Sequence, residues 1–160
     1  MAANTDPIWT KQGAYGAVAI TAANTSSQGG GTIGTDIFLA FTADATNGSY
    51  IREVRFVLGE STISTASTAT VGRIFISSQS SGATTSANTD LLAEVALAQQ
   101  TPSSTAPGVP IVVPINFILP AGKVLLVTNH AAPAANTQWK ALVIAGLGSG
   151  FFGAIAPWLG

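Results

Sequence analysis

The sequence predicts an all-β protein, a single jelly-roll-like antiparallel β-sandwich with an N-terminal arm and an apolar, glycine-rich C-terminal tail. Residues 50–58 and 71–76 alternate in side-chain character with a period of two, which is typical of half-buried strands. Further short apolar runs follow at roughly 8–20-residue spacing, with turn residues between them. No amphipathic helical pattern of useful length appears, so a sandwich or jelly roll is favoured.

Strict alternation assigns the side chains of these two stretches to opposite faces of a sheet. One face of the first stretch would carry Tyr50, Arg52, Val54, Phe56 and Leu58. The other face would carry Ile51, Glu53, Arg55 and Val57. In the second stretch, Val71, Arg73 and Phe75 would oppose Gly72, Ile74 and Ile76.

Three parts are expected along the chain: an arm at 1–12, the β-sandwich domain at 13–146 and an apolar segment at 147–160. In the arm, Asp6-Pro7 disfavours helix, and Ile8 and Trp9 form a small apolar anchor. The tail is expected to pack on the domain or on a neighbouring subunit. Beside the two alternating stretches, the domain is expected to hold strands at 15–22, 36–42, 91–97, 116–119, 123–128 and 139–145.

Prolines mark a long connection in the second half of the chain: Pro102, Pro107, Pro110 and Pro114. Proline cannot donate to a β-ladder, so this connection is predicted to run into an edge strand. The segment 91–97 before it contains Leu and Ala, which favour helix. It lies between two polar loops and has only seven residues, so a strand fits better.

Composition limits the classes of function. Charged residues make up 8% of the chain, whereas about 25% is usual for soluble domains. Such a surface suits a protein that packs against others, because few long side chains lose rotamer freedom when it is covered. The net charge of −1 and the lack of a basic cluster argue against nucleic-acid binding. The absence of cysteine excludes disulfides and thiolate metal sites.

The glycine-rich C-terminal segment matches two sequence motifs, but the surrounding residues do not fit either motif. Gly148, Gly150 and Gly153 fit a dinucleotide-binding spacing, but no acidic residue follows them, so no cofactor is expected. Residues 142–159 are apolar enough to suggest a membrane span, but four glycines and Pro157 make a poor helix there. No membrane partner is expected. The N-terminus lacks a basic segment followed by an apolar one, so the chain is expected to be made in a cytoplasm and left uncleaved.

Titratable side chains do not form a catalytic pattern. His130 is the only histidine, and no nucleophile elbow is present. The carboxylates are scattered singly: Asp36, Asp44, Glu53, Glu60, Asp90 and Glu94. No catalytic, cofactor-binding or metal-binding residue is therefore assigned, and the protein is expected not to be an enzyme. Arg52, Arg55 and Arg73 are candidates for ion pairs with acidic residues on neighbouring strands or subunits.

From residue 50 to about residue 145 the chain resembles a family of small structural proteins of tailed bacteriophages. The resemblance lies in YIREVRFVLGES, TVGRIFISSQSSG, NTDLLAEVAL, INFILPAGKVLLVT and QWKALVIAG. It implies a virion component that binds the outside of the head shell as a decoration, or cement, protein. The implied partners are the major capsid protein and further copies of the chain, as a homotrimer. The implied location is the capsid surface.

Three alternatives remain open at the level of the sequence. One is a major coat protein of a small virus, although the low basic charge argues against packaging nucleic acid. A receptor- or glycan-binding module of a phage head or tail fibre would use exposed aromatic side chains such as Trp139 or Tyr50. A hydrolase would use His130. For the decoration protein, the interface candidates are the apolar residues of the arm and tail: Ile8, Trp9, Phe151, Phe152 and Trp158.

Overall fold

A computed structural model describes residues 12–60, 65–103 and 105–147, apart from the side chain of Glu60. The described residues form strands and no helix. The strands are β1 (Gln12–Ile20), β2 (Gly31–Thr32), β3 (Phe38–Thr42), β4 (Ser49–Glu60), β5 (Thr70–Ser77), β6 (Ala83–Thr84), β7 (Thr89–Leu97), β8 (Ile111–Leu119), β9 (Val124–Asn129) and β10 (Thr137–Leu147).

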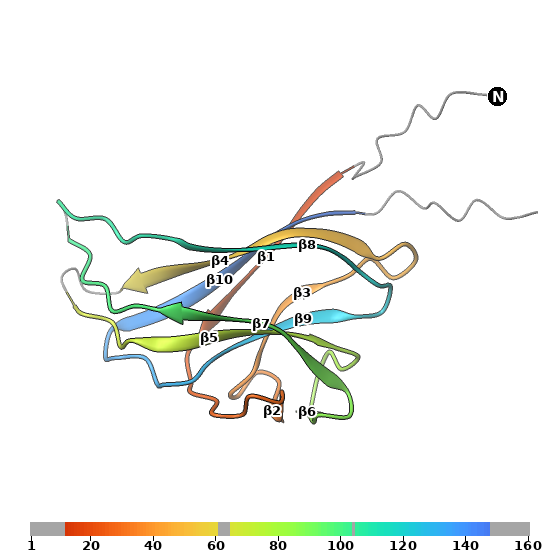
Figure 1. Ribbon diagram of the computed structural model, residues 1–160, viewed down its shortest axis with the longest axis horizontal. Coiled ribbons are helices and arrows are strands. Elements are labelled where there is room, and N and C mark those ends of the chain that lie inside the picture. The colour runs from red at the N-terminus through yellow and green to blue at the C-terminus, as the bar shows by residue number, and fades with distance from the viewer. Residues whose placement is uncertain (1–11, 61–64, 104, 148–160) are drawn as a thin grey trace, which may run out of the picture.

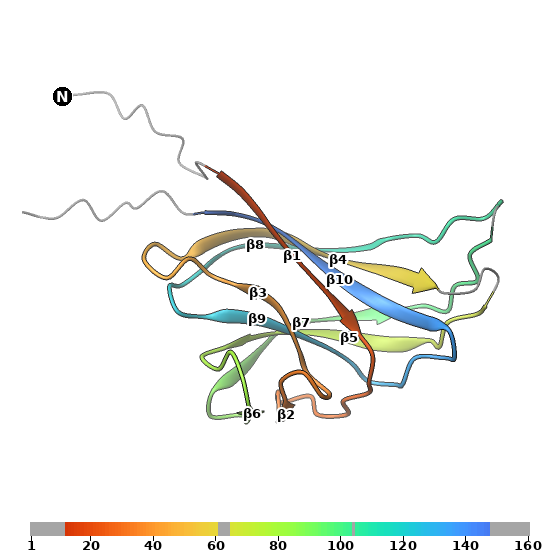
Figure 2. The same cartoon turned by 180° about the vertical axis from the view of Figure 1, so that it is seen from behind.

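Two four-stranded sheets face each other (Figures 1 and 2), with strand orders β1-β10-β4-β8 and β3-β9-β5-β7. Every pairing between these strands is antiparallel. The predicted antiparallel β-sandwich is confirmed. The pairings are nested along the chain: β1 with β10, β3 with β9, β4 with β8, and β5 with β7. Eight long strands distributed in this way between two sheets have the strand order of a jelly roll.

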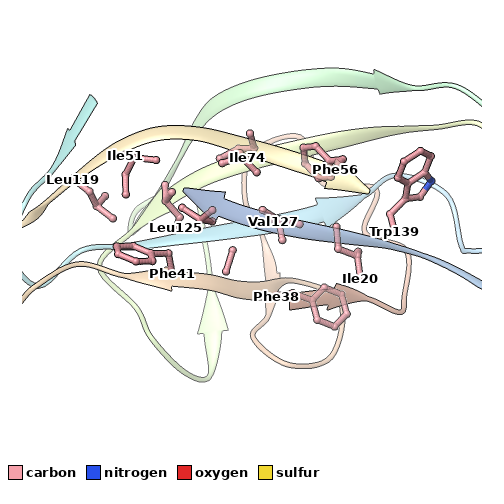
Figure 3. Close-up of a cluster of buried hydrophobic side chains, with 14 of the residues drawn as sticks. Ile20, Phe38, Phe41, Ile51, Phe56, Ile74, Leu119, Leu125, Val127 and Trp139 are labelled. Carbon is pink, nitrogen blue, oxygen red and sulfur yellow. The ribbon is translucent and has the colours of Figure 1, made fainter. Parts of the chain in front are cut away.

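The main hydrophobic core lies between the two sheets (Figure 3). Phe56 of β4, Ile74 of β5 and Val127 of β9 are fully buried there. Trp139 of β10 closes the core at one end and is 2% exposed. Burying side chains of this size contributes roughly 1.5–3 kcal/mol each, so the core is the main source of stability of the sandwich.

Strict alternation is wrong for β4, because the strand contains a β-bulge. Its register with β8 and with β10 shifts between Ile51 and Glu53. The extra residue, Arg52, reverses the side-chain order, so Ile51 lies in the same core as Val54 and Phe56. The sequence had placed Ile51 on the opposite face from Val54 and Phe56.

The predicted alternation holds in the other sheet. Ile74 and Ile76 of β5 pack in the main core, whereas Phe75 belongs to a second cluster on the opposite side of the sheet. In β9, Val124 and Leu126 likewise lie in that second cluster. The segment that contains Ile37 and the small β2–β6 pair cover this side (Figures 1 and 2). The β3-β9-β5-β7 sheet is therefore buried on parts of both faces.

Most expected strands are present, with shifted ends. The ambiguous segment is a strand, β7, and the proline-containing segment ends in β8, an edge strand as predicted. β8 begins at Ile111 and runs through Pro114, earlier than the expected 116–119. β1 ends at Ile20, because Ala23 and Asn24 leave the sheet to pair with Asn129 of the opposite one.

Candidate functional site

The outer face of the β1-β10-β4-β8 sheet, turned away from the core, has no described element over it (Figures 1 and 2). The strand registers align side chains of all four strands in rows across this face. Two central rows are Tyr15, Ile144, Glu53 and Pro114, and then Ala17, Leu142, Arg55 and Val112. A third row adds Tyr50 and Ile118. We call this surface the outer face; it is accessible and mainly apolar.

Large exposed apolar side chains gather on this sheet. Among the described residues, five of the six lie in β1, in β8 or directly before β8: Tyr15, Val109, Val112, Phe117 and Ile118. Ile118 is 64% exposed and Tyr15 is 79% exposed. Tyr15 lies at one edge of the outer face and Val112 and Ile118 lie at the other, with the partly exposed Leu142 and Ile144 of β10 between the edges. Exposed apolar residues scattered singly need no explanation, but an apolar set across one face is typical of a protein–protein contact surface. The outer face is therefore the candidate functional site.

A charged group lies in the middle of the outer face, at the bulge of β4. Glu53 is 7% exposed. Its carboxylate accepts a hydrogen bond of 2.5 Å from Nε of Arg55, and Nε of Arg52 lies 3.5 Å away. The bulge turns Arg52 and Glu53 to the same side of the sheet. Without this carboxylate, two arginines would lie side by side on an apolar surface.

The cations outnumber the acids on the outer face. The side chains of Arg52 and Arg55 are 64% and 42% exposed, so both remain available to a partner. Lys140 of β10 is exposed on the same face, opposite Val57. Among the described side chains of this face, three cations and one carboxylate give a net charge of +2, although the whole chain carries −1.

A second charged group lies on the other sheet and is structural. The Arg73 side chain is 8% exposed; its Nε donates to Oε1 of Glu94 at 2.6 Å, and its Nη1 donates to the carbonyl of Asn24 at 3.2 Å. Nη2 lies 3.4 Å from Nδ1 of His130, which must accept because arginine has only donors. Arg73 thus ties the segment after β1 to the sheet. The ion pair that the sequence predicts for Arg73 is confirmed, with Glu94 of the neighbouring strand as its partner.

An acidic edge patch lies on β7, next to this group. We define it as Asp90, Leu91 and Glu94. Leu91 and Glu94 oppose Phe75 and Arg73, so they lie on the side of the sheet away from the main core. Asp90 is exposed, and Leu91, at 42% exposure, completes the set of large exposed apolar residues. Asp90 opposes Ile76 and therefore points to the other side of β7, so Leu91 shares its surface with Glu94 alone.

The structure changes the aromatic assignments made from the sequence. Trp139 is 2% exposed and packs in the core, so it cannot stack on a sugar, and this part of the glycan-binding alternative is wrong. Tyr50 is half-buried, and its hydroxyl donates to Oδ1 of Asn116 at 3.0 Å. The exposed aromatic of the outer face is Tyr15, which sequence analysis placed only in a strand. The feature of the sequence that could have identified Tyr15 as exposed is the alternation of small and large residues in β1.

The five interface candidates of the arm and tail lie outside the described residues: Ile8, Trp9, Phe151, Phe152 and Trp158. The glycine motif at 148–153 also lies outside them. Within the described ranges, no group of three or more histidine or acidic side chains could hold a metal ion. No helix in those ranges has the length and apolar character needed to cross a membrane.

Comparisons with known proteins give one distant likeness. No family model matches the chain, and no curated protein matches it. A solved structure titled "Cyanophage Pam1 capsid asymmetric unit" is similar, with 15% sequence identity and a TM-score of 0.43. The match covers 92% of each chain. A likeness at this level carries no argument about what this chain does.

Proposed function

We propose that this chain is a bacteriophage virion structural protein that binds the outside of the head shell, through the major capsid protein, and stabilises the shell. The observation that carries the proposal is the outer face, an accessible sheet surface with exposed apolar side chains on both of its edge strands, β1 and β8. Such a surface gains free energy when another protein covers it. Many weak contacts of this kind, repeated around a shell, add up through multivalency.

The sequence resemblance to tailed-phage structural proteins supports the same function. Its segments coincide with β4, β5, β7, β8, β9 and β10, which supply most of both sheets. The resemblance therefore describes the scaffold, including the two strands that flank the charged group on the outer face. It implies no catalytic residue, and the proposed mechanism is adhesion to a preformed lattice.

Binding to heads is the direct test. Purified protein is mixed with washed, expanded heads that lack it, and bound protein is quantified after sedimentation, while mass spectrometry counts copies per virion. We expect saturable binding, hundreds of copies per virion and a higher temperature of head disruption. No binding, together with absence from washed virions, would refute the proposal. A dozen copies or fewer would indicate a tail or portal component instead.

The proposal includes a homotrimer, because capsids offer three-fold and quasi-three-fold positions for an added protein. The arm and tail residues Trp9, Phe151 and Trp158 stay predicted contacts to a neighbouring subunit or to the shell. Substituting each by Ser should weaken head binding while the melting temperature of the isolated protein stays constant. A loss of folding cooperativity in these variants would assign the residues to the domain instead.

The receptor- or glycan-binding alternative retains Tyr50 as its candidate from the sequence, and the structure adds Tyr15. A glycan array distinguishes the two functions. Saturable glycan binding that is lost in Tyr15→Ala or Tyr50→Ala, without binding to heads, would replace the decoration function.

A further inference from the structure

We infer that the outer face recognises carboxylates, and that Arg52 and Arg55 bind acidic side chains of the protein that covers this face. The inference rests on the proposed function for the identity of that protein, the shell subunit. It adds the chemistry of the contact surface and the orientation in which the chain is bound. Both arginines lie at the bulge of β4, beside the carboxylate of Glu53.

Charges are distributed unequally over the molecule. Of the five lysine and arginine side chains in the described ranges, three lie on the outer face, whereas only one of the five described carboxylates, Glu53, lies there. The remaining two cations and four carboxylates give the rest of the described part a net charge of −2, against +2 on the outer face. Because only 8% of the chain is charged, this separation indicates a surface that meets negative charge.

The two arginines retain donors for a partner. A guanidinium group has five N–H donors, and Arg55 uses only its Nε toward Glu53. Nε of Arg52 lies 3.5 Å from the same carboxylate. Among the described residues, no hydrogen bond engages the terminal nitrogens of either arginine, and the two side chains are 64% and 42% exposed. These nitrogens have the fork geometry that binds a carboxylate through two parallel hydrogen bonds.

Glu53 prepares the arginines for binding and does not compete with a partner. It is 7% exposed, and it holds two like charges close together that would otherwise repel each other. Arginines that are already held in place lose less conformational entropy when a partner binds them. Their surroundings across the sheet are apolar, since Glu53 lies between Ile144 and Pro114. A partner that covers this region excludes water, and an ion pair formed there is stronger than one in bulk solvent.

The carboxylates of a second copy are not arranged to fill this role. Asp90 and Glu94 point to opposite sides of β7, and Glu94 is already paired with Arg73. The carboxylates of Asp36 and Asp44 accept hydrogen bonds from backbone amides of their own loops. The described part of a second copy therefore presents no surface of neighbouring unpaired carboxylates, and the acidic partner is a different protein.

The charge separation also sets an orientation. The outer face belongs to one sheet, whereas Asp90 and Glu94 lie on β7 of the other sheet, on the far side of the sandwich (Figures 1 and 2). A molecule with charges separated in this way turns its positive side toward an acidic surface as it approaches. On a shell, the outer face would therefore point inward and the β3-β9-β5-β7 sheet would face solvent.

Ion-exchange chromatography tests the surface without heads. The full-length protein carries a net charge of −1 at pH 7, so with evenly distributed charge it would pass through a column of carboxymethyl groups. We expect the wild type to be retained at low salt and released as salt rises. Arg52→Glu should abolish retention. Lys123→Glu makes the same change in net charge in the turn before β9, outside the outer face, and should elute at higher salt than Arg52→Glu.

Binding to washed heads then tests the partner. The dissociation constant of the wild type should rise with salt, and Arg52→Glu should raise it by about tenfold or more, since close charge pairs couple strongly at interfaces. Lys123→Glu should change it by less than about twofold. If Arg52→Glu fails to fold because Glu53 lies beside it, Lys140→Glu replaces an exposed cation of the same face and decides both measurements. Circular dichroism establishes which variants are folded.

The outcomes are separable from those of the proposed function. A wild type that passes through the column, or equal elution of the outer-face variants and Lys123→Glu, overturns the inference whether or not heads are bound. Head binding that is unchanged in Arg52→Glu and Lys140→Glu overturns it too, and leaves the decoration function intact. Retention that is lost in these variants, without any head binding by the wild type, would support the carboxylate-binding surface and refute the decoration function. Binding to anionic glycans that is lost in Arg52→Glu, with head binding unchanged, would overturn the assignment to a protein partner.

Discussion

Gly16 of β1 lies so close to the main-chain carbonyl of Ala40 in β3 that a Cβ on Gly16 would overlap the carbonyl oxygen. These two residues belong to edge strands of different sheets. A glycine is needed because it lets the two edges approach and close one side of the sandwich, whereas any side chain would push them apart. The closure depends on contact between backbone atoms, which the hydrophobic pattern of the sequence cannot predict.

Replacing Gly16 by Ala should destabilise the protein by about 1–3 kcal/mol, because the carbonyl of Ala40 cannot move aside without shifting β3. Gly13→Ala, in the same strand, is the matched control, since a Cβ there meets nothing within 4 Å. It should change the free energy of unfolding by less than about 0.5 kcal/mol. Denaturant unfolding of both variants provides the comparison. Equal stabilities would show that β1 and β3 are not in contact.

Replacing Glu94 and replacing Arg73 should lower the free energy of unfolding by different amounts. Glu94→Ala leaves a buried guanidinium without its carboxylate and should cost about 2–3 kcal/mol, below the range for a fully buried pair because Glu94 is half exposed. Arg73→Met leaves a carboxylate that water can reach, but it removes the donor to the carbonyl of Asn24, so about 1–2 kcal/mol is expected.

Asp90→Ala, on the same strand, is the control for this pair, with an expected change of under about 0.5 kcal/mol. All three variants are compared by urea unfolding. A larger loss for Arg73→Met than for Glu94→Ala would mean that the contact to Asn24, and not the charge pair, dominates the energetics of the group.

Replacing each of two buried threonines by Val should change the stability of the protein by different amounts. In the described part of the chain, Oγ1 of Thr128 is buried and has no hydrogen-bond partner, so Thr128→Val should be neutral or stabilising. Oγ1 of Thr89 donates to Oγ of Ser77 at 2.9 Å, and its removal should cost about 1 kcal/mol. Thermal unfolding of the two variants checks the sign. A clear loss of stability in Thr128→Val would reveal a partner for its hydroxyl.

The bulge in β4 can be tested with two residues that strict alternation places on one face. Ile51 is fully buried in the core, whereas Val57 is half-buried and opposes the exposed Lys140. Ile51→Ala should cost about 2–5 kcal/mol, because it leaves a cavity between the sheets. Val57→Ala should cost less than about 1 kcal/mol. Similar losses for the two variants, measured by denaturant unfolding, would contradict the bulge.

Much of the fold could be predicted from local pattern, and the failures have physical causes. Alternation assigned the opposite faces of β5 correctly, since Phe75 does lie opposite Ile74, but the burial of both faces was not predicted. It failed in β4 because a bulge is fixed by pairing with β8 and β10, which are distant in sequence. The exposure of Tyr15 and the burial of Trp139 depend likewise on which face of each strand meets the opposite sheet.

The sequence by itself determined that this chain is built of antiparallel strands, that a proline-bearing strand lies at a sheet edge, and that few charges are available for a surface. Periodicity, proline chemistry and composition are local properties, so they can be judged from the sequence without knowing which strands pair in the fold. Only the tertiary structure decided that Arg52, Glu53 and Arg55 share one open apolar face, and that Asp90 and Leu91 lie on the other sheet. Those placements follow from strand pairing across the whole chain, and contacts of that range are set by the packing of the complete core.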